Sequence, residues 1–197
     1  MKYEEQMFTL PELKGISAKQ IEVHLGLYSG YVKHVNVLRE QIQDLSALDK
    51  EKYAYAIAEL RRRLGFEFDG MRMHEYYFKQ FEGGSQILKP ESPLSTLVAE
   101  KYENWDGFIL HFTTVGKMRG IGWTVLYFDP VGKTPHVAWV GDHELGQLSG
   151  LPIILAMDMW EHAYMVDYVP SEKAKYIQAF LENVNWNVAE ERYSTAR

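Results

Sequence analysis

The chain has 197 residues, of which 46% are hydrophobic and 24% are charged, and its formal net charge is −6. These values predict a globular protein of one large or two small domains, and the negative charge argues against a large nucleic-acid-binding surface. Cysteine is absent, which excludes disulfides and thiolate metal sites and leaves imidazole and carboxylate as metal ligands.

The first half of the chain predicts long amphipathic helices. Apolar residues recur at three- and four-residue spacing over residues 18–43, directly after Ser17, a residue type favoured as a helix N-cap. A second helical pattern covers residues 48–64 and is interrupted by Gly65. A third begins near residue 69 and ends at a glycine pair. Long helices joined by short segments predict an antiparallel helical hairpin.

The second half of the chain predicts shorter helices and three strands. A segment rich in Gly and Pro, residues 83–93, is the candidate linker, so the expected domains are 1–84 and 85–197. Beyond it, β-branched and aromatic runs predict strands, the first two of which are joined by a turn as a hairpin. The expected helices are 94–102, 105–116 and 176–193, and the expected strands are 123–128, 136–140 and 151–157.

Asp158 and His162 lie four residues apart, directly after the apolar run of the third strand. A carboxylate and an imidazole at the end of a buried strand are costly to desolvate unless a charged partner compensates them. A metal ion would be such a partner, and a structural salt bridge would be another. These two residues alone do not decide between the two interpretations.

Two further histidines, His24 and His74, lie within the apolar stripes of predicted helices. Taken singly, a histidine in such a place is more often a core residue than a metal ligand. Together with Asp158 and His162, however, they would supply three imidazoles and one carboxylate. That donor set suits a redox-active first-row metal with a position left for water or substrate. No role is assigned to the remaining histidines His34, His111 and His136.

The segment from Asp158 to Tyr164 resembles the most diagnostic signature of the iron/manganese superoxide dismutases. Four other segments resemble motifs of that family, in the same order along nearly the whole chain: residues 16–24, 74–78, 120–126 and 183–186. The resemblance implies that the protein converts superoxide to dioxygen and hydrogen peroxide by redox cycling of one mononuclear iron or manganese ion. The ligands that it implies are His24, His74, Asp158 and His162.

The resemblance also implies residues around the ligands. A Gln or His hydrogen-bonds the metal-bound solvent in this family, and because one of its two usual positions is Gly70 here, we expect His143 to be that donor. Tyr31 corresponds to the active-site tyrosine, although its segment is one residue shorter than usual, which would rotate it by about 100° on a regular helix. Trp123 is expected in the aromatic shell.

A dimer is a further implication, because in this family the residue at Glu161 bonds a ligand histidine of a second subunit. A cross-subunit bond between a His and a Tyr is also usual, but the corresponding positions hold Tyr28 and Met165, so that bond is predicted to be missing or replaced. The basic residue near the substrate funnel is not clearly retained, and Lys173 or Lys175 is the nearest candidate.

The sequence thus predicts an α+β fold, with an N-terminal antiparallel helical hairpin followed by an α/β domain that contains a three-stranded antiparallel sheet. We expect a cytoplasmic superoxide dismutase that uses iron in preference to manganese, with use of both left open. The expected partners are the superoxide anion and a second copy in a homodimer, with a homotetramer left open, but no nucleic acid and no membrane. The alternatives are another mononuclear iron or manganese enzyme, such as an oxygenase, and a non-catalytic metal-binding relative.

Overall fold

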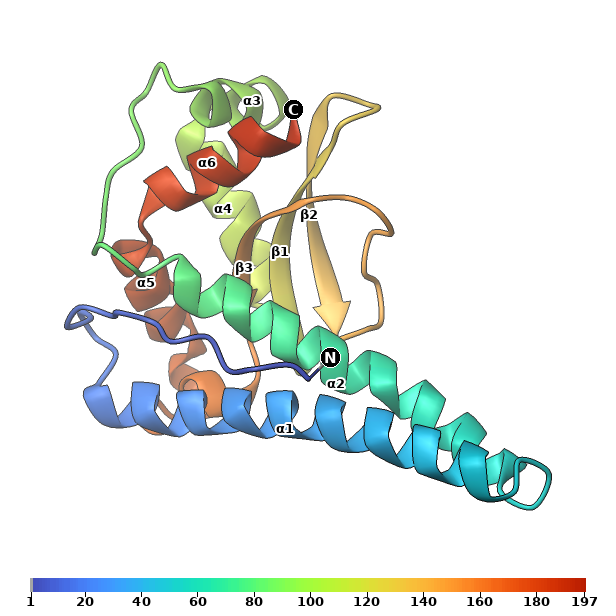
Figure 1. Ribbon diagram of the computed structural model, residues 1–197. Helices are drawn as coiled ribbons and strands as arrows, with labels where there is room; N and C mark the ends of the chain where they lie inside the picture. Colours follow the sequence, from blue (N-terminus) through green and yellow to red (C-terminus); the bar gives the residue numbers. More distant parts are fainter. Residues whose placement is uncertain (1) are drawn as a thin grey trace.

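Two long helices form the N-terminal part of the computed structural model, which describes residues 2–197. Helix α1 (Ala18–Leu48) and helix α2 (Ala54–Lys79) run antiparallel, and their joined end projects from the rest of the molecule (Figure 1). The side chain of Ser17 accepts a hydrogen bond from the Gln20 backbone N–H, which confirms it as the N-cap of α1. The predicted helical hairpin is therefore present.

The predicted interruption at Gly65 is wrong, because α2 runs through this residue without a break. A glycine inside a helix costs about 1 kcal/mol relative to alanine. That local cost is small compared with the stabilisation from the packing of α2 along α1. Helix α1 itself extends beyond its predicted end at residue 43, to Leu48. Tertiary contacts thus override the local preference of one residue.

A three-stranded antiparallel sheet forms the second part of the fold, as predicted. Its order is β2-β1-β3, with β1 (Gly122–Asp129) in the centre, β2 (Thr134–Gly141) on one side and β3 (Ile153–Asp158) on the other. The β1–β3 register places Trp123 opposite Asp158. Since β1 is buried from its first to its seventh residue, the end of β3 lies deep in the molecule.

Three of the remaining helices, at residues 93–102, 105–116 and 186–196, pack against the sheet (Figure 1). The remaining helices are α3 (Pro93–Tyr102), α4 (Trp105–Gly116), the short 3-10 helices η1 (Glu161–Ala163) and η2 (Pro170–Glu172), α5 (Lys173–Asn183) and α6 (Trp186–Ala196). The single closing helix predicted for residues 176–193 is therefore wrong, since two helices occupy this range. The break lies at Asn185, whose side chain caps α6 and whose backbone N–H donates to the Gln80 carbonyl (2.8 Å).

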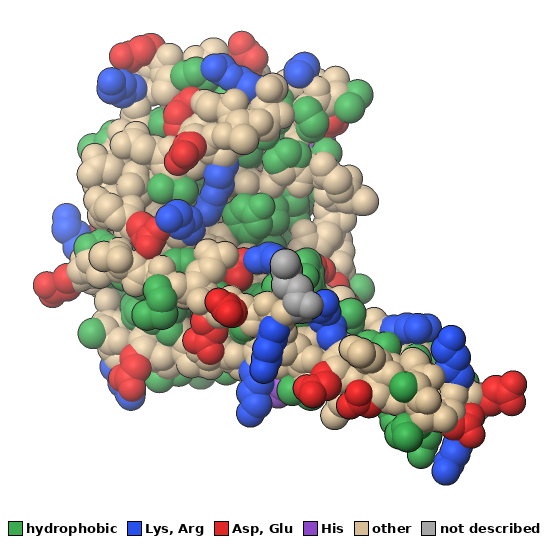
Figure 2. Space-filling model, in the orientation of Figure 1, with side chains coloured by type: hydrophobic (Ala, Val, Ile, Leu, Met, Phe, Trp, Pro, Cys, Tyr) green, Lys and Arg blue, Asp and Glu red, His purple; other side chains and the backbone are tan. Residues whose placement is uncertain are grey.

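The surface carries charges of both signs. On the face drawn in Figure 2, basic and acidic side chains are interspersed along the helical hairpin and over the body of the molecule. Within residues 2–197, no helix combines the length and the apolar character needed to cross a membrane. The predicted domain division between residues 84 and 85 stays a prediction, and Met1 of the first domain lies outside the described residues.

Candidate metal centre

Four side chains from four separate elements meet between the helical hairpin and the sheet. His24 comes from α1, His74 from α2, Asp158 from the end of β3 and His162 from η1, and one ligand atom of each lies within 4.8 Å of the others. The Nε2 atoms of His24 and His162 lie 3.0 and 3.1 Å from Asp158 Oδ2. Atoms that bind one ion at about 2.1 Å lie no more than about 4.2 Å apart, so the cluster is close to the size of a site for one ion.

The hydrogen bonding of His74 shows that a cation fits this cluster. His74 Nδ1 donates to the Gly70 carbonyl (2.6 Å), so in the neutral imidazole Nε2 carries a lone pair and no proton. This Nε2 is buried without a hydrogen-bond partner among the described residues and lies 3.6 Å from Asp158 Oδ2. A lone pair and a carboxylate oxygen repel each other unless a positive charge lies between them. A bound metal ion would satisfy both atoms.

Burial and the neighbouring side chains together set the charge state of these groups. Burial lowers the pKa of His24 and pushes the pKa of His74 well below its usual value, so both imidazoles are neutral at pH 7. Burial opposes ionisation of Asp158 as well, but the surrounding imidazoles, His162 foremost, hold the pKa of its carboxyl below the ordinary range. Neutral imidazoles and an ionised carboxylate are the forms that bind a metal.

A chain of three hydrogen-bonded side chains lies beside the four donors. Trp123 Nε1, which can only donate, bonds His143 Nδ1 (2.9 Å). The neutral imidazole therefore carries its proton on Nε2, which donates to the Tyr31 hydroxyl oxygen (2.7 Å). His143 is fully buried, and burial lowers its pKa to about 4. The predicted bond from His143 to metal-bound solvent stays a prediction; the partner in the structure is Tyr31.

Gly70 makes room for Tyr31. A Cβ atom at Gly70 would lie 2.6 Å from Tyr31 Cδ1, too close for an unshifted ring. The Tyr31 ring stands against the ring of His74, with centroids 5.0 Å apart. The shortened segment between His24 and Tyr31 thus still brings Tyr31 to the donor cluster, and the absence of a side chain at position 70 is what permits it.

Two residues that the sequence did not single out support the centre. Tyr176 donates from its hydroxyl to the backbone carbonyl of Asp158 (2.7 Å). Gln20 donates from Nε2 to the backbone carbonyl of His162 (2.6 Å). A polar side chain in the apolar stripe of α1, one turn before His24, was a signal for Gln20. Tyr176 gave no such signal, because a tyrosine in an amphipathic helix resembles an ordinary core residue.

Tyr28 and Met165, the two positions at which a cross-subunit bond is predicted to be missing or replaced, differ in their surroundings. Tyr28 is buried, and its hydroxyl accepts from the backbone N–H of Gln6 (2.8 Å) and donates to Glu75 (3.2 Å). Met165 is 47% exposed, and its neighbour in the turn, Glu161, is also exposed. The hydroxyl of Tyr28 therefore bonds two groups of its own chain.

Lys173 and Lys175, the two candidates for the basic residue near a substrate funnel, also differ in their contacts. Lys173 donates to the Met118 carbonyl (3.0 Å) and lies over the ring of Trp139. Lys175 pairs with Glu172 (2.6 Å) in an exposed ion pair. Burial lowers the pKa of Lys173, whereas the charge of Glu161 opposes that shift. Lys173 is thus the lysine whose charge interacts with the turn that carries His162.

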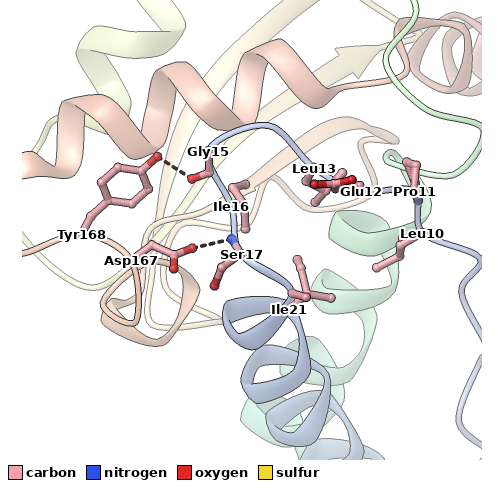
Figure 3. Close-up of a pocket in the computed structure, with 11 residues that line it drawn as sticks. Leu10, Pro11, Glu12, Leu13, Gly15, Ile16, Ser17, Ile21, Asp167 and Tyr168 are labelled. Carbon is pink, nitrogen blue, oxygen red and sulfur yellow. Dashed lines mark hydrogen bonds between the residues drawn. The ribbon is translucent and has the colours of Figure 1, made fainter.

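A separate hollow of about 700 Å³ lies at the start of α1 (Figure 3). None of the four donors lines it. Within it the backbone N–H of Ser17 donates to Asp167 (2.6 Å), and the Tyr168 hydroxyl donates to the Gly15 carbonyl (2.5 Å). These bonds attach the segment after His162 to the beginning of α1.

Known proteins similar to this chain share one description. A family model for the C-terminal domain of iron/manganese superoxide dismutases matches residues 90–192. A protein of Saccharolobus solfataricus named as an iron superoxide dismutase is 32% identical over 90% of this chain and 85% of its own length. One of Tetrahymena pyriformis with the same name is 32% identical over 92% and 93%. One of Propionibacterium freudenreichii subsp. shermanii, named as a manganese/iron superoxide dismutase, is 29% identical over 97% and 98%.

Proposed function

Because this chain belongs to the iron/manganese superoxide dismutase family, we infer that it converts two superoxide anions and two protons into dioxygen and hydrogen peroxide. The observation that carries this function is the convergence of three imidazoles and one carboxylate, with the lone pair of His74 turned toward Asp158. When iron or manganese is bound there, it supplies a one-electron couple between the +3 and +2 states. His24, His74, Asp158 and His162 would hold it.

The hydrogen-bonded chain of Trp123, His143 and Tyr31 would orient the proton that is donated during the reaction. Trp123 keeps the His143 proton on Nε2, and that N–H is directed to the Tyr31 oxygen. The Tyr31 O–H is then left to donate to a reacting oxygen species near His74. Because burial raises the pKa of Tyr31, its hydroxyl keeps its proton at pH 7 and is available as a donor rather than as a phenolate. Three side chains thus orient one proton without carrying charge.

The donor set weighs against the alternative functions. An iron oxygenase of the common type uses two histidines and one carboxylate and leaves more positions open, whereas a third imidazole is present here. A non-catalytic relative would have no need of the ordered chain from Trp123 to Tyr31. The metal is iron or manganese; relatives are named for each and for both, and iron stays our preference.

The function is tested by loading the protein separately with iron and with manganese. Bound metal is measured by elemental analysis, and superoxide decay is followed for each form and for the metal-free protein. We expect one ion per chain and dismutation by at least one loaded form, with none by the metal-free form. Stoichiometric metal without dismutation in either form would contradict the proposed activity.

We also propose that the protein is a homodimer in which Glu161 hydrogen-bonds His162 of a second copy. Glu161 is exposed beside the 16% exposed side chain of His162, so a carboxylate from another chain has access to this imidazole. Such a contact is symmetric by construction and occurs twice in a two-fold dimer. A cytoplasmic location remains part of the proposal.

A further inference from the structure

Gln20 is a buried amide that joins the helical hairpin to the segment carrying His162. It lies on α1, one turn before His24, and is 1% exposed. Its Nε2 donates to the His162 carbonyl (2.6 Å), and its Oε1 accepts from the backbone N–H of Val166 (3.0 Å). Both ends of one side-chain amide are therefore engaged by the same short turn.

These two backbone groups would bond each other in an α-helical turn, which joins the N–H of each residue to the carbonyl four positions earlier. The turn begins with the 3-10 helix η1, and the Tyr164 N–H donates to the Glu161 carbonyl three positions earlier (3.2 Å). Only the next N–H, that of Met165, makes a helical bond to the carbonyl four positions earlier (Glu161, 2.9 Å). The Gln20 amide occupies the place of the helical bond between His162 and Val166. In this turn the His162 Nε2 lies 3.1 Å from Asp158 Oδ2.

Asp158 has other means of support. Its strand is paired with β1, the backbone N–H of Met159 donates to the Gly122 carbonyl (2.8 Å), and Tyr176 bonds the Asp158 carbonyl itself (2.7 Å). His162 lies outside the sheet on a helix of three residues. The orientation of the His162 backbone therefore depends on individual side-chain bonds in a way that the orientation of Asp158 does not.

We propose that Gln20 is a positioning residue of the metal centre, which acts by fixing the backbone of His162. The inference rests on the ligand set proposed above. Removing the amide lets the turn close or shift, which rotates the imidazole away from its place beside Asp158. The consequence is faster loss of the bound metal, beyond any loss of stability. Outer residues that orient a ligand typically change metal affinity by about 10-fold to 100-fold.

Gln80 is a matched control. It is also fully buried, and its amide likewise bonds both groups of one backbone segment, with Nε2 donating to the Ala156 carbonyl (2.6 Å) and Oε1 accepting from the Ala156 N–H (3.3 Å). Its partner lies within β3, however, where pairing with β1 holds the strand. Loss of this amide should lower stability as much as loss of Gln20 does, without moving a ligand.

The experiment compares Gln20→Met and Gln80→Met with the wild-type protein. Methionine has a similar length and shape but cannot donate or accept as the amide does. The rate at which manganese passes to excess EDTA is measured for each loaded protein, and the melting temperature is measured with and without metal. We expect both variants to melt earlier without metal, but only Gln20→Met to release manganese faster, by about tenfold, and to gain less in melting temperature on loading.

The inference is overturned if Gln20→Met releases manganese at the wild-type rate, or if Gln80→Met releases it equally fast. Should Gln20→Met fail to fold, Gln20→Leu is the second variant, with the same expectation. Failure of the proposed function would be distinct, since the wild-type protein itself would then bind no stoichiometric metal or would not dismutate superoxide.

Discussion

The two sides of the metal centre are built in different ways. His24 lies near the beginning of the long helix α1 and His74 near the end of the long helix α2. Neither side chain has exposed surface, and the centroids of their rings lie 5.0 Å apart. His162 lies on a three-residue helix, is 16% exposed and has the exposed residues Glu161 and Met165 for neighbours. One side is fixed by helix packing, whereas the other is fixed by single hydrogen bonds and faces outward. The outward side is therefore where solvent has access, and where the proposed second subunit would contact the centre.

The largest effects are expected from removing one ligand on each side. Both His74→Ala and His162→Ala should abolish stoichiometric metal binding and dismutation, because three donors hold the ion too weakly. The metal-free proteins should differ: His74→Ala leaves a cavity in the core and should lower the free energy of unfolding by about 2 kcal/mol. His162→Ala should lower it by less, about 1 kcal/mol, because the partly exposed side chain leaves a smaller cavity although its bond to Asp158 is lost. Urea unfolding of the two metal-free variants measures the difference.

Equal destabilisation by the two substitutions would contradict this difference between the two sides, because it would show that the outward turn is as tightly packed as the helical hairpin. Retention of one ion per chain by either variant would remove that histidine from the ligand set.

A second prediction concerns the outward side alone. Glu161→Ala should weaken the proposed dimer by about 2 kcal/mol, or about 30-fold in its dissociation constant, because the carboxylate partner of a histidine at the interface is lost. Sedimentation velocity over a range of protein concentrations measures this. The control is Glu172→Ala, which removes a carboxylate from an exposed ion pair with Lys175 and should change association little. A Glu161→Ala variant as dimeric as the wild type would refute the contact.

The smallest effect tests the hairpin side. Gly70→Ala places a Cβ 2.6 Å from Tyr31 Cδ1, so the Tyr31 ring must move and its bond to His143 must lengthen. We expect the ion to be retained and dismutation to fall by about tenfold, since small misplacements of a proton donor are costly. Gly65→Ala, on the same helix with 3.4 Å to its nearest neighbour, is the control and should keep full activity. Unchanged activity of Gly70→Ala would show that the position of Tyr31 does not matter.

Some elements were predictable because local chemistry decides them. Ser17 begins α1 as a capping residue, and helices α3 and α4 lie where their apolar periodicity placed them. The errors at Gly65 and Asn185 have one cause. A glycine inside α2 is tolerated because α2 packs along α1, and the final helix breaks where Asn185 bonds the distant carbonyl of Gln80. Helix α1 and the Gln80 carbonyl are both distant in sequence from the residues that they affect, so no local sequence pattern predicted these two features.

The sequence by itself determined the chemistry of this protein. Without cysteine, the metal donors had to be imidazole and carboxylate, and His24, His74, Asp158 and His162 lie on motifs whose order along the chain predicted one site. Only the tertiary structure decided how these donors are held. Gln20 and Tyr176 bond backbone carbonyls that lie 142 and 18 residues away in the sequence, respectively. The space at Gly70 matters only because Tyr31 packs against it. Such contacts depend on where the backbone of one element passes another, which residue types and their spacing do not encode locally.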